Sequence, residues 1–461
     1  MAKKKYHFIG AGGIGMSGLA KLLMKNGALV TGSDRENSPI VENLLALGAD
    51  IRIGHATANL ELPVEAVVIS AAIKDGNPEL TSAREKGCKI YKYAQMLGRL
   101  MDNYAGIAVC GTHGKSTTSG WLAFVLQQTG LAPSYIIGAD VPQLGGSSGV
   151  GNSRYFIAEA CEYDRSFLNL HPQITVMLNI EQDHLDYYKN ESEIVEAFTE
   201  FTDCLRPDGV IIANGTDANV TAVLNRLGAH RKYQTFGLDR GCDFSAQNIE
   251  LIDGLYRFDV YHRHNLLGQA AISLPGRHNI LNALAVVAAA VSAGAGAKDV
   301  LHFLGRFAGA DRRLMLKARA AGITILDDYA HHPTEIRASL SAIRQRFDPA
   351  RIWCVFQPHQ YSRTRFLLDD FAESFKLADI TIVPQIYFVR DTAAAKKQIN
   401  AQVLVERVRR QGCEALFIDD FGRICDYLKA NVRKNDLVVT MGAGDIWKVA
   451  DEYIQWLGRN S

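Results

Sequence analysis

The sequence predicts an α/β protein of three domains, and three observations support this fold class. With 461 residues, the chain is longer than one hydrophobic core usually organises. Short runs rich in β-branched residues alternate with longer amphipathic segments, which is typical of mostly parallel sheets covered by helices. The hydrophobic content of 48% is that of a globular protein, so each domain can bury a core.

The first predicted domain spans residues 1–104 and has a Rossmann-like alternation of strands and helices. Its expected strands are 7–10, 28–34, 66–73 and 88–93. Helical stretches separate them, as the crossovers between parallel strands require. We therefore expect a parallel sheet that ends near Tyr104.

The second predicted domain spans residues 105–312. Its expected strands are 106–111, 155–162, 174–180 and 209–214. Residues 244–274 have a period of two in hydrophobicity, which predicts an antiparallel excursion from the parallel sheet. The apolar segment 278–294 predicts a buried helix.

The third predicted domain, 313–461, has a second Rossmann-like pattern. Its expected strands are 323–330, 352–358, 379–385, 415–420 and 436–445. No short repeat or low-complexity linker interrupts the chain, so the boundaries rest on the changes of pattern alone.

Charge and composition exclude several classes of protein. The net charge of +1 gives no electrostatic footprint for nucleic acid. No apolar run approaches the roughly 18 residues of a membrane span, and no signal-peptide core follows Met1. The eight cysteines show neither CxxC pairs nor zinc spacing. We expect a cytoplasmic protein with small-molecule partners, no nucleic acid and no membrane; the pattern does not indicate an oligomeric state.

Two glycine-rich loops are the most informative motifs. Gly10, Gly12 and Gly15 form G-x-G-x-x-G after a predicted strand, and Asp34 ends the next strand. This fingerprint predicts a diphosphate at a helix N-terminus, with the acid on a ribose. Taken alone, it favours an NAD-dependent dehydrogenase. A UDP-sugar also carries a diphosphate, however, and a tight turn without a ligand is a further alternative.

The second loop follows strand 106–111 and precedes a helix. Gly111, Gly114, Lys115 and Ser116 fit a P-loop, in which backbone amides surround phosphates, the lysine neutralises the β/γ oxygens and the serine holds Mg²⁺. The usual motif has another glycine where this chain has Val109, so the loop is a shorter form. It predicts a nucleotide triphosphate as ligand.

Eight segments, in order along nearly the whole chain, resemble the Mur ligases, which build the peptide stem of bacterial peptidoglycan. Residues 111–118 resemble the ATP loop of that family, and residues 10–20 resemble the UDP-binding start of the member that uses L-alanine. The other segments are EACEYDRSF, NIEQDHLD, LPGRHNILNALA, DDYAHHPTEI, FQPHQYSRTR and GAGDIW.

This resemblance implies an ATP-dependent ligase that forms an amide through an acyl phosphate. It implies ATP and Mg²⁺ as cofactors, and UDP-N-acetylmuramate and L-alanine as substrates. The first loop would hold UDP and the second ATP. A family member that joins a preformed tripeptide to the same nucleotide sugar remains an alternative, because the third domain does not distinguish the two amines.

The expected catalytic residues are Lys115, Glu159 and His184. Glu159 ends a strand, where an acid faces the nucleotide in an α/β sheet. The resemblance implies that Ser116, Glu159 and His184 hold metal ions. A salt-bridged edge carboxylate is the alternative for Glu159, and Asp183 and Asp186 are alternatives to His184.

Residues are expected to bind each of the three parts of ATP: the adenine, the ribose and the phosphates. The resemblance assigns the 278–282 segment to adenine, although His278 or Asn279 could instead cap a helix. It assigns Asp328 to the ribose, while Arg312 or Arg313 would reach the γ-phosphate from the hinge. The full expected set is Gly111, Thr112, His113, Gly114, Lys115, Ser116, Thr117, His278, Asn279, Asn282, Arg312 and Asp328.

Substrate-binding residues are expected at the first loop and in the third domain. His359, Arg363 and Arg365 follow a strand and could hold the carboxylate of alanine. His331 and His332 precede Pro333 and could cap a helix instead. Relatives usually have arginine where this chain has Gln360, so that position is given no role. The expected set is Gly10, Gly12, Gly13, Gly15, Met16, Ser17, Asp34, His332, His359 and Arg363.

Overall fold

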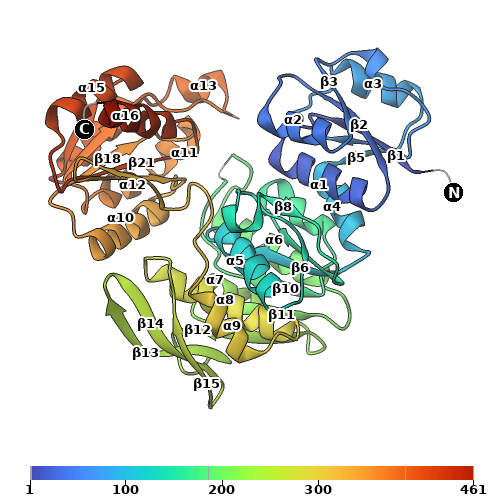
Figure 1. Ribbon diagram of the computed structural model, residues 1–461, viewed down its shortest axis with the longest axis horizontal. Helices are drawn as coiled ribbons and strands as arrows, with labels where there is room; N and C mark the ends of the chain where they lie inside the picture. The colour runs from blue at the N-terminus through green and yellow to red at the C-terminus, as the bar shows by residue number, and fades with distance from the viewer. Residues whose placement is uncertain (1–2, 185, 390, 460–461) are drawn as a thin grey trace.

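The computed structural model describes residues 3–184, 186–389 and 391–459, and the described chain contains three mostly parallel sheets, one in each part of the sequence. Figure 1 shows the blue N-terminal part and the orange-to-red C-terminal part on either side of a central green part. The predicted α/β class is therefore confirmed. No helix among these described residues is both long and apolar enough to cross a membrane.

The first sheet is entirely parallel, with strand order β3-β2-β1-β4-β5. The order reverses at β1, and ligands of open α/β sheets bind at such a switch point. The loop after β1 is the first glycine loop. The elements are β1 Lys5–Ile9, α1 Ile14–Lys25, β2 Leu29–Asp34, α2 Pro39–Ala46, β3 Asp50–Ile53, η1 Thr57–Asn59, β4 Ala66–Ile69, α3 Pro78–Glu85, β5 Ile90–Lys92 and α4 Tyr93–Met101.

The second sheet has the order β15-β14-β13-β12-β11-β10-β6-β9-β7-β8. Strands β13, β14 and β15 pair antiparallel, as the period of two predicted. The elements are β6 Ala105–Cys110, α5 Lys115–Gln128, β7 Ser134–Ile136, η2 Pro142–Leu144, β8 Ser148–Gly149, β9 Tyr155–Glu159, η3 Tyr163–Asn169, β10 Ile174–Met177, α6 Glu191–Asp203, β11 Val210–Asn214, α7 Ala218–Leu224, β12 Lys232–Gly237, β13 Phe244–Ile252, β14 Leu255–His262, β15 Asn265–Ala271, α8 His278–Ser292 and α9 Ala297–Leu304.

The third sheet has the order β16-β17-β21-β18-β19-β20, and only its edge strand β16 pairs antiparallel. The elements are β16 Met315–Ala320, β17 Ile323–Asp328, α10 Pro333–Phe347, β18 Ile352–Phe356, α11 Tyr361–Phe366, α12 Leu368–Ser374, β19 Ile380–Val383, α13 Ala393–Lys396, α14 Ala401–Arg410, β20 Glu414–Phe417, α15 Phe421–Asn431, β21 Leu437–Met441 and α16 Trp447–Arg459.

One apolar cluster joins the first and second sheets, each of which also has a cluster of its own, whereas the clusters of the third sheet are separate. Phe8 of β1 and Phe156 of β9 belong to the same buried cluster, so the N-terminal part packs firmly on the central part. The clusters around Phe356 and Trp353 contain only residues after 313. The C-terminal part therefore meets the rest mainly through polar contacts, described below.

The β13–β14 turn contacts helix α10 of the C-terminal part, below which it lies in Figure 1. Tyr256 donates a hydrogen bond to Gln345 of α10 (3.1 Å). Gly254 has a φ of +73°, and a Cβ there would lie 2.4 Å from the Cα of Arg346. Glycine is required at this turn by both its conformation and the closeness of α10.

Candidate active site

The second glycine loop joins β6 to α5 and has the geometry of a phosphate cradle. Gly111 and Gly114 have φ values of +137° and +83°, and Gly114 is the N-cap residue of α5. A Cβ at Gly114 would lie 2.9 Å from Oδ1 of Asn282. Glycine is therefore required at 114 both by its positive φ and by the closeness of Asn282, at a helix N-terminus of the kind that binds anions.

Lys115 forms a buried ion pair that the sequence did not indicate. Its Nζ lies 2.9 Å from Oε2 of Glu162 and also donates to the carbonyl of Thr112 (3.1 Å). Burial alone would lower the pKa of Lys115, but the Glu162 carboxylate outweighs it and raises that pKa. The lysine is therefore charged and held beside the loop. His184 joins this group, with Nε2 3.5 Å from Oε1 of Glu162.

The three residues predicted to hold metal make separate contacts. The Glu159 carboxylate, at the end of β9, accepts a hydrogen bond from the amide of Gly138. Ser116 Oγ accepts one from Arg313 Nη2 (3.2 Å). His184 contacts Glu162. Glu162 was missed, although it lies in the quoted segment EACEYDRSF.

The sequence left open which hinge arginine reaches the loop, and in the structure Arg313 is the one that contacts it. Arg312 pairs with Asp327 (Nε–Oδ2 3.0 Å) and donates to the carbonyl of Gly442 (2.6 Å). Both partners lie in the third sheet or just after it. Arg312 therefore fixes the hinge to the C-terminal part, while Arg313 points across to Ser116.

A cavity of about 740 Å³ lies between the second and third sheets beside this loop. Burial lowers the pKa of His278 to about 4, so a neutral imidazole lines it. The amide of Asn282 donates to Oδ1 of Asn279 (2.9 Å). The predicted ATP-binding residues among its lining are His113, Gly114, Thr117, His278, Asn279, Asn282 and Asp328. The structure therefore brings the predicted adenine and ribose residues and part of the phosphate loop to one cavity. The other predicted residues are not in its lining: Gly111, Thr112, Lys115, Ser116 and Arg312.

Asp328 also supports a prediction about stability. Burial raises its pKa to about 6, although a hydrogen bond from Ser339 opposes the shift. In the unfolded chain it ionises near pH 3.8. Between these values only the unfolded chain releases the proton, so stability falls as the pH rises from about 4 to about 6 and then levels off.

We expect this loss to total about 3 kcal/mol and to disappear in Asp328→Asn, whose amide oxygen still accepts from Ser339. Unfolding by denaturant at several pH values, with the difference taken between the two proteins, isolates this group from other carboxylates. A difference that is constant from pH 4 to 6 would contradict the expectation.

His113 of the loop links the central part to the C-terminal part. Its Nε2 lies 3.1 Å from Oε2 of Glu181, and its Nδ1 lies 3.1 Å from Oε1 of Glu335 on α10. Burial would lower its pKa, but the hydrogen bonds to Glu181 and Glu335 raise it to about 9. Neither glutamate was predicted, since only the fold brings them to the loop.

The histidines at the start of α10 are partly structural. Nδ1 of His332 accepts a hydrogen bond from the amide of Thr334 (3.3 Å), so this residue does cap the helix. Its Nε2 lies 3.3 Å from the carbonyl of Gln182. Nδ1 of His331 lies 3.2 Å from Oε2 of Glu335.

Arg363 forms a buried ion pair across the same junction. Its Nη2 and Nε donate to Oδ1 of Asp183 (2.8 and 3.1 Å). Burial would raise the pKa of Asp183, but the Arg363 guanidinium holds it well below its usual range. Nη1 of Arg363 lies 3.4 Å from Nδ1 of His359. Gln360 adopts a φ of +72° just before α11 and is buried.

The first glycine loop lies at the carboxyl end of β1. Asp34 accepts a hydrogen bond from the amide of Gly12 (2.7 Å), so this acid shapes the loop itself. Gly13 precedes α1, and a Cβ at Gly15 would lie 2.6 Å from Tyr93. The predicted residues Met16 and Ser17 are buried in α1, and Ser17 Oγ donates to the carbonyl of Ile14 (3.0 Å). Both side chains are thus packed inside the domain, and their contact with a substrate stays a prediction.

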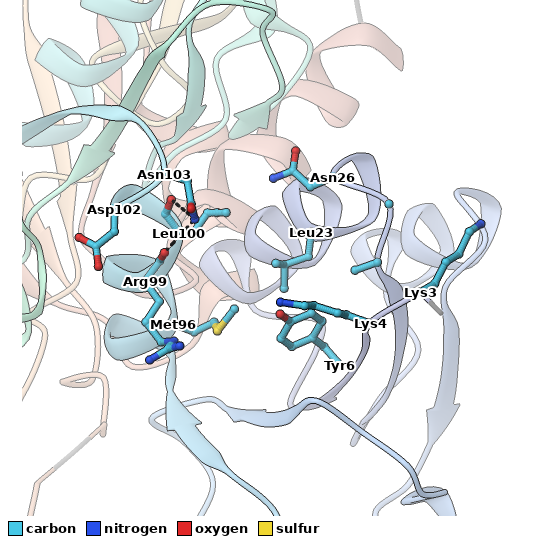
Figure 2. Close-up of a pocket in the computed structure, with 12 residues that line it drawn as sticks. Lys3, Lys4, Tyr6, Leu23, Asn26, Met96, Arg99, Leu100, Asp102 and Asn103 are labelled. Atoms are coloured by element: carbon cyan, nitrogen blue, oxygen red, sulfur yellow. Dashed lines mark hydrogen bonds between the residues drawn. The ribbon is translucent and has the colours of Figure 1, made fainter. Parts of the chain in front are cut away.

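A second hollow, of about 680 Å³, lies at the other end of the first sheet. Figure 2 shows Tyr6 and Lys4 near Met96 and Arg99 in this hollow. Strand β1 begins at Lys5 and ends at Ile9, so the glycine loop lies at the opposite end. Lys3, Lys4 and Arg99 are exposed, and the hollow contains none of the predicted site residues.

Comparison with known families and proteins agrees with this arrangement. Three family descriptions match successive parts of the chain: "Mur ligase family, catalytic domain" over residues 5–105, "Mur ligase middle domain" over 109–290 and "Mur ligase, glutamate ligase domain" over 312–444. The chain is 40% identical to a UDP-N-acetylmuramate–L-alanine ligase of Caldanaerobacter subterraneus subsp. tengcongensis, covering 98% of this chain and 97% of that protein.

Two solved structures are similar over the whole length. A UDP-N-acetylmuramate–alanine ligase from Thermotoga maritima superposes with a TM-score of 0.81 at 27% identity, covering 99% of this chain and 100% of the other. A murein peptide ligase from Psychrobacter arcticus superposes with a TM-score of 0.72 at 25% identity, covering 99% of both chains.

Proposed function

The chain belongs to the Mur ligase family, and from this premise we propose that it uses ATP to join L-alanine to the carboxylate of UDP-N-acetylmuramate. Its relatives of about 40% identity over nearly the full chain carry that activity in their names. The observation that carries the proposal is the P-loop beside a cavity of about 740 Å³, with Arg313 and Glu335 reaching it from the C-terminal part.

Each part of the chain has a role in this proposal. Residues 1–104 would hold the UDP-sugar at the first glycine loop, 105–312 would hold ATP, and 313–461 would bring the amino acid and close the site. In this proposal each glycine loop binds a phosphate-containing ligand. A dehydrogenase would use only the first loop and leave the second without a ligand.

The chemistry needs a carboxylate to attack the γ-phosphorus of ATP, which gives an acyl phosphate and ADP. The amine of L-alanine then attacks the acyl carbon, and phosphate leaves. Both reactants of the first step are anions, so cations must surround the transferred group. Glu162 and Ser116 hold Lys115 and Arg313 beside the loop, which supports this role for both cations.

The proposal assigns Mg²⁺ to Ser116, Glu159 and His184, because this ion prefers oxygen ligands and is usually held by one or two carboxylates together with the phosphates of the nucleotide. The Ser116 hydroxyl and the Glu159 carboxylate offer such oxygens, and His184 lies beside Glu162. When bound, the ion would neutralise charge on the phosphates. Lys115 and Arg313 would add further positive charge beside the loop.

Phosphate release tests the proposal directly. The protein is mixed with ATP, UDP-N-acetylmuramate and either L-alanine or a murein tripeptide, with Mg²⁺ or with a chelator. We expect release with alanine and Mg²⁺, and none without the sugar or the metal. Phosphate release with the tripeptide but not with alanine would show that the amine substrate is the tripeptide. No phosphate release with either amine would refute the ligase activity.

A further inference from the structure

Three side chains with metal-binding atoms meet where the central and C-terminal parts touch. His113 comes from the P-loop, Glu181 follows β10, and His332 caps α10. One ligand atom from each lies within 4.8 Å of the other two. Nε2 of His113 is 3.1 Å, and Nδ1 of His332 is 3.9 Å, from Oε2 of Glu181.

These separations are near those of a tetrahedral zinc site. With metal–ligand bonds of about 2.0–2.2 Å, neighbouring ligand atoms lie about 3.3–3.6 Å apart. The two distances to Glu181 bracket this range, and the ligand atoms of all three residues lie within 4.8 Å of one another, so the side chains must draw closer to complete the geometry. Between His113 and Glu181, a bound ion would replace the proton of the hydrogen bond that now joins them.

The outer nitrogen of each histidine has an acceptor. Nδ1 of His113 faces the Glu335 carboxylate (3.1 Å), and Nε2 of His332 faces the carbonyl of Gln182 (3.3 Å). Metal-binding histidines usually donate their other N–H to a carboxylate or carbonyl in this way. On the inner side, Nε2 of His113 faces Glu181, while Nδ1 of His332 accepts a hydrogen bond from the amide of Thr334 (3.3 Å), so a bound ion would take over this lone pair from the helix cap.

We propose that His113, Glu181 and His332 form a Zn²⁺ site that joins the central and C-terminal parts of the chain. Two imidazoles and one carboxylate suit Zn²⁺, whereas Mg²⁺ prefers oxygen ligands alone. His113 and Glu181 also line the 740 Å³ cavity, so the fourth position opens to that space. The site uses none of Ser116, Glu159 and His184, and it does not depend on the proposed ligase activity.

Zinc affinity of the full chain tests this proposal. Zn²⁺ is titrated against a chromophoric chelator without nucleotide or Mg²⁺, in a Cys161→Ser background, because the exposed Cys161 thiol could bind zinc independently. We expect one Zn²⁺ per chain. Glu181→Gln and His332→Asn should each weaken it by more than about 100-fold, and Glu335→Gln by about 10-fold. Asparagine at 332 can still cap α10, so this variant should fold.

The matched control is His171→Gln, which removes an exposed histidine paired with Asp102 (3.2 Å) and should leave zinc affinity unchanged. Co²⁺ in place of Zn²⁺ should give d–d bands without thiolate charge-transfer bands. Equal zinc affinity in the parent and in both ligand variants, or no stoichiometric binding by the parent, would overturn the proposal. If zinc affinity falls in Glu181→Gln but not in His332→Asn, the ion does not join the central part to the C-terminal part.

Discussion

Lys115→Ala is expected to lower phosphate release by about 10³-fold or more and to destabilise the protein. The ammonium is the charged group that contacts both the loop carbonyls and Glu162, so its loss removes a cation from the transferred phosphoryl group. It also leaves the buried Glu162 carboxylate beside His184 without the ammonium that neutralises it. Breaking a buried ion pair on one side typically costs about 3–5 kcal/mol.

A double variant separates the two effects. Lys115→Met with Glu162→Gln removes both charges, so most of the lost stability should return while phosphate release stays low. Denaturant unfolding and phosphate release are measured on the same preparations. If the double variant regains activity with stability, Lys115 acts by supporting the loop, and its proposed role on the phosphate is wrong.

The sequence predicted features that depend on neighbours along the chain. Gly111 and Gly114 were identified because a strand, a tight loop and a helix follow one another, and the structure shows why no side chain fits at Gly114. The parallel sheets and the antiparallel strands β13–β15 were predicted from local periodicity in the same way. Short strands such as β3 and β7 carried too little pattern to be seen.

Contacts between distant segments could not be predicted from pattern. Glu162, Glu181 and Glu335 approach the loop only after β9, β10 and α10 take their places, and nothing in their local sequence indicates a partner. The choice between Arg312 and Arg313 depends on backbone direction at the hinge, where Arg312 has a φ of +58°. The carboxylates that neutralise the cations of the loop are therefore the main part of the site that could be found only from the structure.

Arg363→Ala is expected to raise the KM for L-alanine by about 10–100-fold, because a charged hydrogen bond contributes about 1.5–3 kcal/mol. Nε and Nη2 of Arg363 donate hydrogen bonds to Asp183. Nη1 faces His359, on the side where the amino acid is proposed to bind. The KM values for ATP and the UDP-sugar should change little. Steady-state kinetics with each substrate varied in turn gives this comparison.

Asp183→Asn is the matched control, because it breaks the same buried ion pair from the other side. Both variants should lose similar stability, since each leaves one charge of the pair without its partner. Only Arg363→Ala removes the group that would contact the amino acid. A KM for alanine that rises equally in both variants would mean that Arg363 serves the junction between the two parts and has no direct role in binding the carboxylate. A rise confined to Arg363→Ala would place the amino acid beside His359, where the C-terminal part meets the loop.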